Sequence, residues 1–187
     1  MSNARLAGTL WLIVIIAGVV SVLTQTTSPR VAFAANLFAG VCYLGVTVLL
    51  YELFKSVEHR LALFAACCGL AGVASGAATE LIKTDPPTLG FYVSMLFFGF
   101  QILSIGYLIT RSHPIPRVLG VLLMLGGASY FINSFANFLG LGVGASLGRF
   151  VIPIAILGEG ALTFWLVVKG ATLAEARARQ PAPSRSS

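Results

Sequence analysis

Long apolar runs alternate with short polar connections along the whole chain. Six uncharged or nearly uncharged runs cover residues 6–28, 31–51, 61–79, 88–110, 118–148 and 150–168. A helix rises about 1.5 Å per residue, so about 20 residues cross a hydrocarbon core of about 30 Å. The pattern therefore predicts an all-α polytopic membrane protein whose six transmembrane helices lie at about 6–25, 31–54, 61–82, 88–110, 117–139 and 150–169.

The fifth run is too long for one helix. Its end, residues 140–148, is rich in glycine, so we place a loop there and end the fifth helix near Leu139. The other connections are short and contain turn residues, as in 26–29, 85–87 and 113–116. Neighbouring helices are therefore expected to be antiparallel within one transmembrane domain, residues 1–170.

Composition supports a lipid bilayer as the main surrounding of this domain. Of 187 residues, 57% are hydrophobic and 10% are charged, whereas roughly a quarter are charged in soluble domains. Beyond Gly170 the chain becomes rich in Ala, Arg, Pro and Ser, which predicts a disordered cytosolic tail over residues 171–187.

The net charge of +6 is explained by membrane orientation. Basic residues stand singly at segment ends and do not cluster with aromatics on one face, which argues against nucleic acid as a partner. One side of the predicted topology holds nine basic residues: Arg5, Lys55, Arg60, Arg111, Arg117, Lys169, Arg177, Arg179 and Arg185. The other holds three, Arg30, Lys83 and Arg149. This bias predicts both termini in the cytoplasm.

The first span also resembles a signal peptide, because Ala32-Phe-Ala34 offers small residues to a peptidase. Its apolar run exceeds the usual 7–15 residues or so, however, and Arg30 separates the run from that motif. We therefore expect the span to be retained.

Glu159 is the most informative polar residue, because it falls near the bilayer midplane, where a charge is costly. It should either be protonated or pair with a donor on another helix. Pro153 and the flanking Gly158 and Gly160 suggest a locally broken helix, as at transporter binding sites. The alternative is a neutral acid bonded to Gln101 or an Asn, with glycines admitting a neighbouring helix.

Further polar residues fall in the predicted outer half of the membrane or near its middle. They are Asn36, Glu80, Gln101, Asn133 and Asn137. One interpretation is a polar pocket that opens outward with Glu159 at its floor. The other is a set of ordinary hydrogen bonds between helices, worth about 0.6 kcal/mol each.

Two sequence patterns concern helix packing. Gly69, Gly72 and Gly76 place small residues along one side of the third helix, which predicts close packing against another helix of this chain, a second copy or another membrane protein. In addition, Tyr51-x-x-x-Lys55 is similar to Tyr107-x-x-x-Arg111, and each lies where a helix enters the cytoplasm. An internal repeat and a chance similarity of two basic loops both explain this pair.

The chain lacks recognisable catalytic, cofactor or metal motifs. The three cysteines, Cys42, Cys67 and Cys68, lie in apolar runs, and both histidines fall in predicted cytosolic loops. Enzyme chemistry would depend on Glu80, Asp85 and Glu159 alone. We therefore expect no enzymatic activity, no cofactor and no bound metal.

Several segments together resemble a known family. They are Arg5-Leu-Ala-Gly-Thr-Leu-Trp-Leu12, Leu53-Phe-Lys-Ser-Val57, Gly106-Tyr-Leu-Ile-Thr-Arg-Ser112, Ile115-Pro-Arg-Val-Leu-Gly-Val-Leu-Leu123, Gly127-Ala-Ser-Tyr-Phe-Ile-Asn-Ser-Phe135, Gly158-Glu159 and Trp165-Leu-Val-Val-Lys-Gly170. The chain is similar over nearly its whole length to the bacterial membrane family catalogued as domain of unknown function 4386. The resemblance implies a six-span protein of the bacterial inner membrane without an established activity.

Two functions follow as hypotheses. The first is binding or passage of a small solute or lipid through the outer-half polar pocket. The second is a structural or accessory subunit that packs against other membrane proteins through the third helix.

Overall fold

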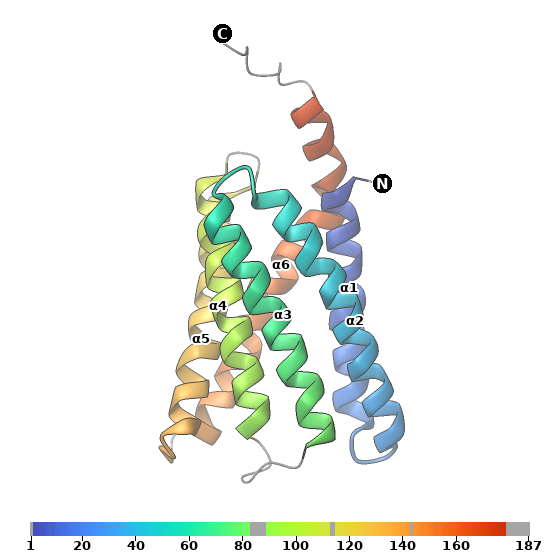
Figure 1. The fold of residues 1–187 in the computed structure, drawn as a ribbon, viewed down its shortest axis with the longest axis vertical. Coiled ribbons are helices and arrows are strands. Elements are labelled where there is room, and N and C mark those ends of the chain that lie inside the picture. The colour runs from blue at the N-terminus through green and yellow to red at the C-terminus, as the bar shows by residue number, and fades with distance from the viewer. Residues whose placement is uncertain (1, 83–88, 113–114, 143, 179–187) are drawn as a thin grey trace.

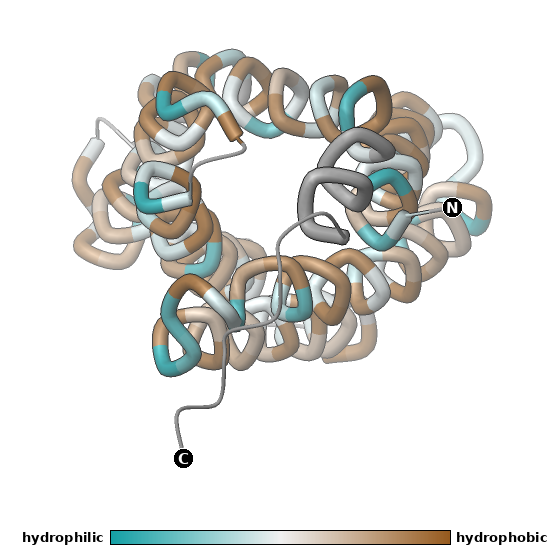
Figure 2. The backbone as a smooth tube through the Cα atoms, turned by 90° about the horizontal axis from the view of Figure 1, so that it is seen from above, coloured by the Kyte–Doolittle hydropathy of each residue, from teal (hydrophilic) through white to brown (hydrophobic). Residues whose placement is uncertain are grey.

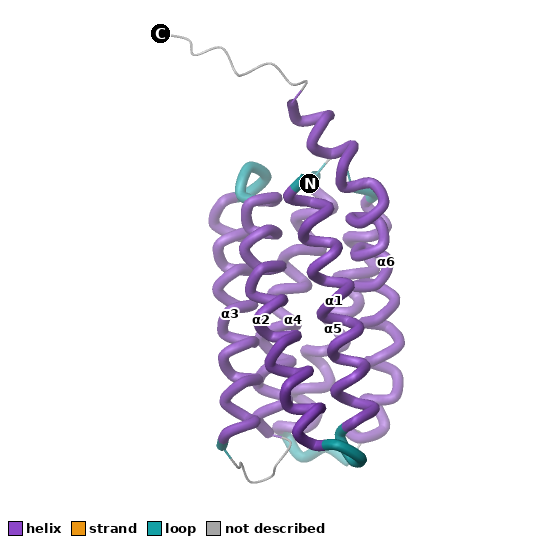
Figure 3. The backbone as a smooth tube through the Cα atoms, turned by 90° about the vertical axis from the view of Figure 1, so that its right-hand side faces the viewer, coloured by secondary structure: helices purple, strands orange, loops and turns teal. Residues whose placement is uncertain are grey.

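The residues that the structure describes form six helices (Figure 1, Figure 3). The computed structural model describes residues 2–82, 89–112, 115–142 and 144–178. The helices are α1 Asn3–Thr24, α2 Pro29–Phe54, α3 His59–Leu81, α4 Leu89–Arg111, α5 Arg117–Phe138 and α6 Gly144–Ala178. All six are long and apolar enough to cross a membrane, and the described residues contain no strand. The prediction of six transmembrane helices in an all-α fold is confirmed.

Local sequence explains where the helices begin. The hydroxyl of Ser2 accepts a hydrogen bond from the backbone N–H of Arg5 and so caps α1. Pro29 occupies the first turn of α2, where its missing N–H and fixed φ do no harm. From α1 to α5 the helix ends agree with the predicted ones to within a few residues.

The last helix differs from its prediction in three respects. It begins at Gly144, inside the stretch predicted as a loop, and it continues to Ala178. Residues 171–178 are therefore helical and not disordered, because Ala, Leu, Glu and Arg extend an existing helix without a new nucleation step. Residues 179–187 lie outside the described residues. Finally, α6 is continuous through Pro153 and Gly158–Gly160, so the predicted local break is wrong.

The helices follow one another around a ring, which α6 closes by packing against α1 (Figure 2). The N-terminus, the C-terminal ends of α2 and α4 and the end of α6 lie together at one end of the bundle, called here the termini end (Figure 1). The other end is called the opposite end. Hydrogen bonds secure the closure: the Ser2 hydroxyl donates to the Gly170 carbonyl over 2.6 Å, and Arg5 Nε donates to the Val167 carbonyl over 3.0 Å.

Glycine pairs set the close contact between α4 and α5. A Cβ atom on Gly120 would lie 2.6 Å from the carbonyl oxygen of Gly106, and one on Gly127 would lie 2.9 Å from that of Gly99. These distances are too short for any side chain, so the two backbones touch directly at two levels. Small residues permit such contacts between membrane helices, where dispersion replaces the hydrophobic effect as the driving force.

Buried side chains are distributed unevenly along the bundle. From the level of Glu159 to the termini end the buried residues include many large side chains: Trp11, Tyr43, Val46, Leu50, Leu53, Phe54, Ile102, Ile105, Leu108, Ile109, Leu123, Leu162 and Leu166. Toward the opposite end the buried residues that the structure describes are mostly small or polar: Ala17, Ala32, Ala39, Ser94, Asn133, Ser134, Ala136, Val151 and Ala155. The large buried apolar side chains are thus concentrated on the termini side.

The outer surface carries large apolar side chains, as expected for a surface in contact with lipid. Leu23 is 71% exposed and Phe164 is 72% exposed, and exposed Val, Ile, Leu and Phe side chains occur on all six helices. Soluble monomers rarely expose apolar patches beyond a few hundred Å². The exposed surface therefore supports the membrane assignment independently of helix length.

Candidate functional site

Glu159 lies midway along the membrane-spanning part of α6 and accepts hydrogen bonds from two other helices. The indole Nε1 of Trp11 on α1 donates to Oε2 over 3.3 Å, and the hydroxyl of Tyr130 on α5 donates to Oε1 over 2.8 Å. Trp11 is buried, whereas Glu159 and Tyr130 are partly buried. Each carboxyl oxygen thus accepts a hydrogen bond from an uncharged donor. This agrees with the expectation that Glu159 pairs with a donor on another helix.

Glycines bring the neighbouring helices close enough for these bonds. A Cβ atom on Gly158 would lie 2.7 Å from the carbonyl oxygen of Leu122 on α5. Similarly, a Cβ atom on Gly8 of α1 would lie 2.7 Å from Cβ of Leu166 on α6. Gly160 has no such neighbour within 4 Å. The expectation that glycines beside Glu159 admit another helix is therefore met by Gly158 and not by Gly160.

Gln101 belongs to a second polar cluster. Its Oε1 accepts a hydrogen bond from the Tyr43 hydroxyl over 2.9 Å, and its Nε2 donates to the Thr47 hydroxyl over 3.2 Å. Gln101 therefore bonds to α2, and the predicted pairing of Glu159 with Gln101 or an Asn is wrong. The rings of Trp11 and Tyr43 meet edge to face with centroids 6.2 Å apart, so the two clusters are neighbours.

The other predicted pocket residues are scattered. Asn133 is buried, and Nδ2 of Asn137 donates to its carbonyl over 2.8 Å and to its side-chain Oδ1 over 3.4 Å. Asn36 on α2 is exposed. The side chain of Glu80 lies outside the described part of the structure. The structure therefore groups Glu159 with Trp11 and Tyr130 rather than with the set predicted from the sequence.

Sequence reasoning missed several residues of the site. Tyr130, Asn133, Ser134 and Asn137 follow the spacing i, i+3, i+4, i+7, which places them on one face of a helix. That spacing could have identified Tyr130 and Ser134. Trp11 gave no signal, because a tryptophan in an apolar run resembles any other lipid-facing or core aromatic residue.

The glycines of α3 face α4 of the same chain. A Cβ atom on Gly72 would lie 2.7 Å from the ring of Phe98, and one on Gly69 would overlap the side chain of Gln101. Ser94 packs beside Gly76, and its hydroxyl donates to the Gly72 carbonyl over 2.8 Å. These contacts agree with the internal alternative for close packing of this helix.

A cavity of about 190 Å³ lies between α3 and α4 at the opposite end. Its lining consists of Ser75, Ala78, Thr79, Ile82, Gly90 and Val93. None of the predicted pocket residues belongs to this lining.

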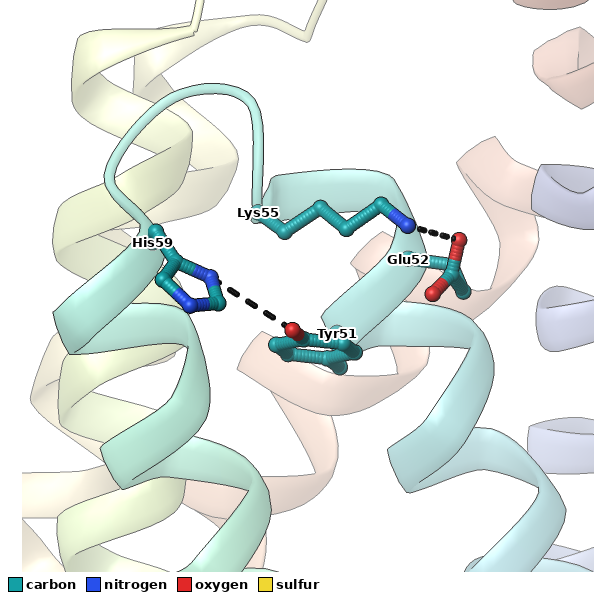
Figure 4. A network of polar contacts seen from close by, with 4 residues as sticks. All are labelled: Tyr51, Glu52, Lys55 and His59. Carbon is teal, nitrogen blue, oxygen red and sulfur yellow. Dashed lines mark hydrogen bonds and ion pairs between the residues drawn. The ribbon is translucent and has the colours of Figure 1, made fainter.

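The termini end carries two similar clusters of aromatic and basic residues. At the end of α2, Lys55 Nζ pairs with Glu52 Oε2 over 2.6 Å, and the Tyr51 hydroxyl lies 3.4 Å from His59 Nδ1 (Figure 4). The hydrogen bond to Glu52 raises the pKa of Lys55 above its ordinary value.

The two repeated motifs make the same contact. Lys55 Nζ lies 5.9 Å from the ring centre of Tyr51, and the Arg111 guanidinium lies 5.0 Å from that of Tyr107. Both arrangements fall in the range of cation–π contacts. Each contact places an aromatic ring and a cation together at the termini end. Aromatic and basic residues commonly anchor helices at a membrane interface.

The chain is similar to proteins of unknown function. The family model described as Domain of unknown function (DUF4386) matches residues 19–89 and 83–170. An uncharacterised protein of Archaeoglobus fulgidus is 29% identical over 134 residues, which cover 70% of this chain and 78% of that protein. No solved structure matches. The family matches cover most of the chain, so this six-helix membrane protein belongs to the DUF4386 family.

Proposed function

We propose that this protein binds or passes a small solute or lipid, which reaches Glu159 from the opposite end of the bundle. It resides in a bacterial cytoplasmic membrane with both termini in the cytoplasm, so that the opposite end faces outward. The nine basic residues on the termini side, against three on the other side, support this orientation.

The hydrogen bonds of Trp11 and Tyr130 to Glu159 carry the proposal. An acid in a transmembrane segment is expensive, and such residues commonly mark a pathway for a substrate or an ion. Both donors are uncharged, so an ionised Glu159 keeps its full negative charge. The position therefore favours a ligand that brings a positive charge or a hydrogen-bond donor, and a binding role rather than a catalytic one.

The uneven filling of the bundle supports entry from the opposite end. On the termini side of Glu159, large apolar side chains such as Leu162 and Leu166 are fully buried. On the other side the buried residues are mostly alanines together with Asn133, Ser134 and Ser94. A polar group can therefore approach Glu159 from the opposite end without displacing a large apolar core.

The accessory role through α3 has less support. Its glycine face packs against Phe98, Ser94 and Gln101 of α4. A partner protein could use that face only by displacing α4. An accessory subunit would therefore need another surface of this chain.

Ligand-induced stabilisation tests the proposal. Wild type, Glu159→Gln and Glu52→Gln are reconstituted in vesicles, and thermal unfolding is measured with a panel of small organic cations, neutral solutes and lipids. Glu52→Gln is the matched control, because Glu52 is partly buried at the termini end, away from Glu159, and pairs with Lys55. A ligand should stabilise wild type and Glu52→Gln but not Glu159→Gln. Equal responses of wild type and Glu159→Gln across the panel would contradict a site at Glu159.

A further inference from the structure

Two buried hydroxyl groups, one on α5 and one on α6, have no hydrogen-bond partner within the described part of the chain. They belong to Ser134 on α5, which has no exposed surface, and Thr163 on α6, which is 2% exposed. Two other serines of these helices bond to their own helix backbone: Ser129 donates to the Gly126 carbonyl over 2.6 Å, and Ser104 donates to that of Phe100 over 2.8 Å. A buried unpaired hydroxyl costs about 1–3 kcal/mol, and ordered water is its usual partner.

These two hydroxyls flank the Tyr130–Glu159 hydrogen bond. Ser134 is four residues after Tyr130, and Thr163 is four residues after Glu159, so each lies on the same helix face about 6 Å further along. Because α5 and α6 are antiparallel, Ser134 lies on the opposite-end side of the bond. Thr163 lies on the termini side.

A polar stripe continues from Ser134 toward the opposite end. Asn133 and Asn137 lie on the same face of α5, which ends at Phe138, and they are joined by the hydrogen bonds from Asn137 Nδ2. The stripe defined by Tyr130, Asn133, Ser134 and Asn137 therefore connects Glu159 with the end of the helix. On the termini side of Glu159, by contrast, Leu162 and Leu166 are fully buried.

We propose that this stripe holds water and conducts protons between the opposite end and Glu159. The carboxylate of Glu159 takes a proton from a hydronium ion in the stripe and leaves water, and the reverse step returns the proton. The groups that face Glu159 are Trp11 of α1 and Tyr130 of α5, with Tyr43 of α2 next to Trp11. This inference rests on the proposed function. In it, a proton moves to and from Glu159 either together with the solute or in its place.

Infrared spectroscopy of the full-length protein in vesicles tests the path without any solute. The carbonyl band of a protonated Glu159 is assigned as the band that is lost in Glu159→Gln. After transfer to D2O this band shifts in frequency, and the rate of that shift measures proton exchange at Glu159. In Ser134→Ala this rate should fall about tenfold, because the stripe loses a water-binding hydroxyl. Ser129→Ala is the matched control, since that hydroxyl already bonds to its own helix.

Thr163→Val tests the direction of the path. It should leave the exchange rate close to that of wild type, because Leu162 and Leu166 close that side. A slower exchange in Thr163→Val together with normal exchange in Ser134→Ala would overturn the proposal, as would equal rates in both variants and wild type. The proposal would also be overturned if the folded wild-type protein showed no carbonyl band of a protonated Glu159. Failure of the solute panel alone would leave these infrared results unaffected, so the two proposals fail separately.

Discussion

The hydroxyl of Tyr130 donates a 2.8 Å hydrogen bond to Glu159 and so joins α5 to α6 midway along the bundle. At the same level the Trp11 indole joins α1 to α6 through the other carboxyl oxygen. One acid thus links three helices, including the first and the last. Removal of either donor should therefore affect both the stability of the ring and the chemistry of Glu159.

Tyr130→Phe should lower stability by about 1 kcal/mol, because one hydrogen bond to a partly buried carboxyl group is lost. In the Glu159→Gln background the same change should cost less, since the carboxyl acceptor is already gone. A double-mutant cycle on thermal unfolding in detergent measures this coupling. Tyr92→Phe is the control, because no hydrogen bond of the Tyr92 hydroxyl is found within the described residues. Strictly additive effects of Tyr130→Phe and Glu159→Gln would refute an energetic link.

The two glycines that flank Glu159 should respond differently to alanine. Gly158→Ala should destabilise the protein by about 1–3 kcal/mol, because the new Cβ atom would lie 2.7 Å from the Leu122 carbonyl and force α5 away. Gly160→Ala meets nothing within 4 Å and should be neutral or slightly stabilising through higher helix propensity. Thermal unfolding of both variants tests the pair. Similar losses in the two would show that the α5–α6 contact does not depend on Gly158.

Most of the fold follows from the sequence because the bilayer imposes a simple length rule on apolar runs. That rule places α1 to α5 with small errors at their ends. It fails at α6, where glycines at 140–148 suggested a loop although the helix begins at Gly144. Glycine only lowers helix propensity, and packing can outweigh that loss.

The site was predicted less completely, because membrane position identifies an acid but not its partners. Glu159 stands out in an apolar helix, and its pairing with a donor was expected. Which donor it meets depends on how α1 and α5 pack against α6, and a single sequence does not contain that information. Asn36 illustrates the same limit: its depth in the membrane was inferred, but its exposure was not.

The glycine face of α3 provides a test of internal packing against assembly. Gly72→Leu should destabilise the monomer, because a Cβ atom at this position would already lie 2.7 Å from the Phe98 ring of α4. Gly18→Leu on α1 is the control, since a Cβ atom there meets nothing within 4 Å. Unfolding temperature and oligomeric state are measured together in detergent. A variant Gly72→Leu that keeps wild-type stability but loses a partner or a second copy would instead support the accessory role.

The raised pKa of Lys55 predicts a specific pH dependence. Its hydrogen bond to Glu52 favours the charged amine, so the folded pKa exceeds the ordinary value of 10.5. The contribution of the pair to stability is therefore fully present at neutral pH, and it is lost only as pH rises through the folded pKa. In Glu52→Gln the pKa of Lys55 should fall toward its ordinary value. NMR titration of isotopically methylated lysines measures the pKa of Lys55 in both proteins. An unchanged pKa in Glu52→Gln would show that the ion pair does not form in solution.

The orientation of the bundle can be tested by cysteine labelling. In a background with Cys42, Cys67 and Cys68 replaced by alanine, single cysteines are introduced at Ser2 on the termini side and at Gln25 on the opposite side. A membrane-impermeant maleimide applied to intact cells should label Gln25→Cys only, whereas Ser2→Cys should require opened membranes, because the excess of basic residues keeps the termini end in the cytoplasm. The reverse pattern would mean that the stripe from Asn137 to Glu159 opens inward. Any solute or proton reaching Glu159 along it would then come from the cytoplasm.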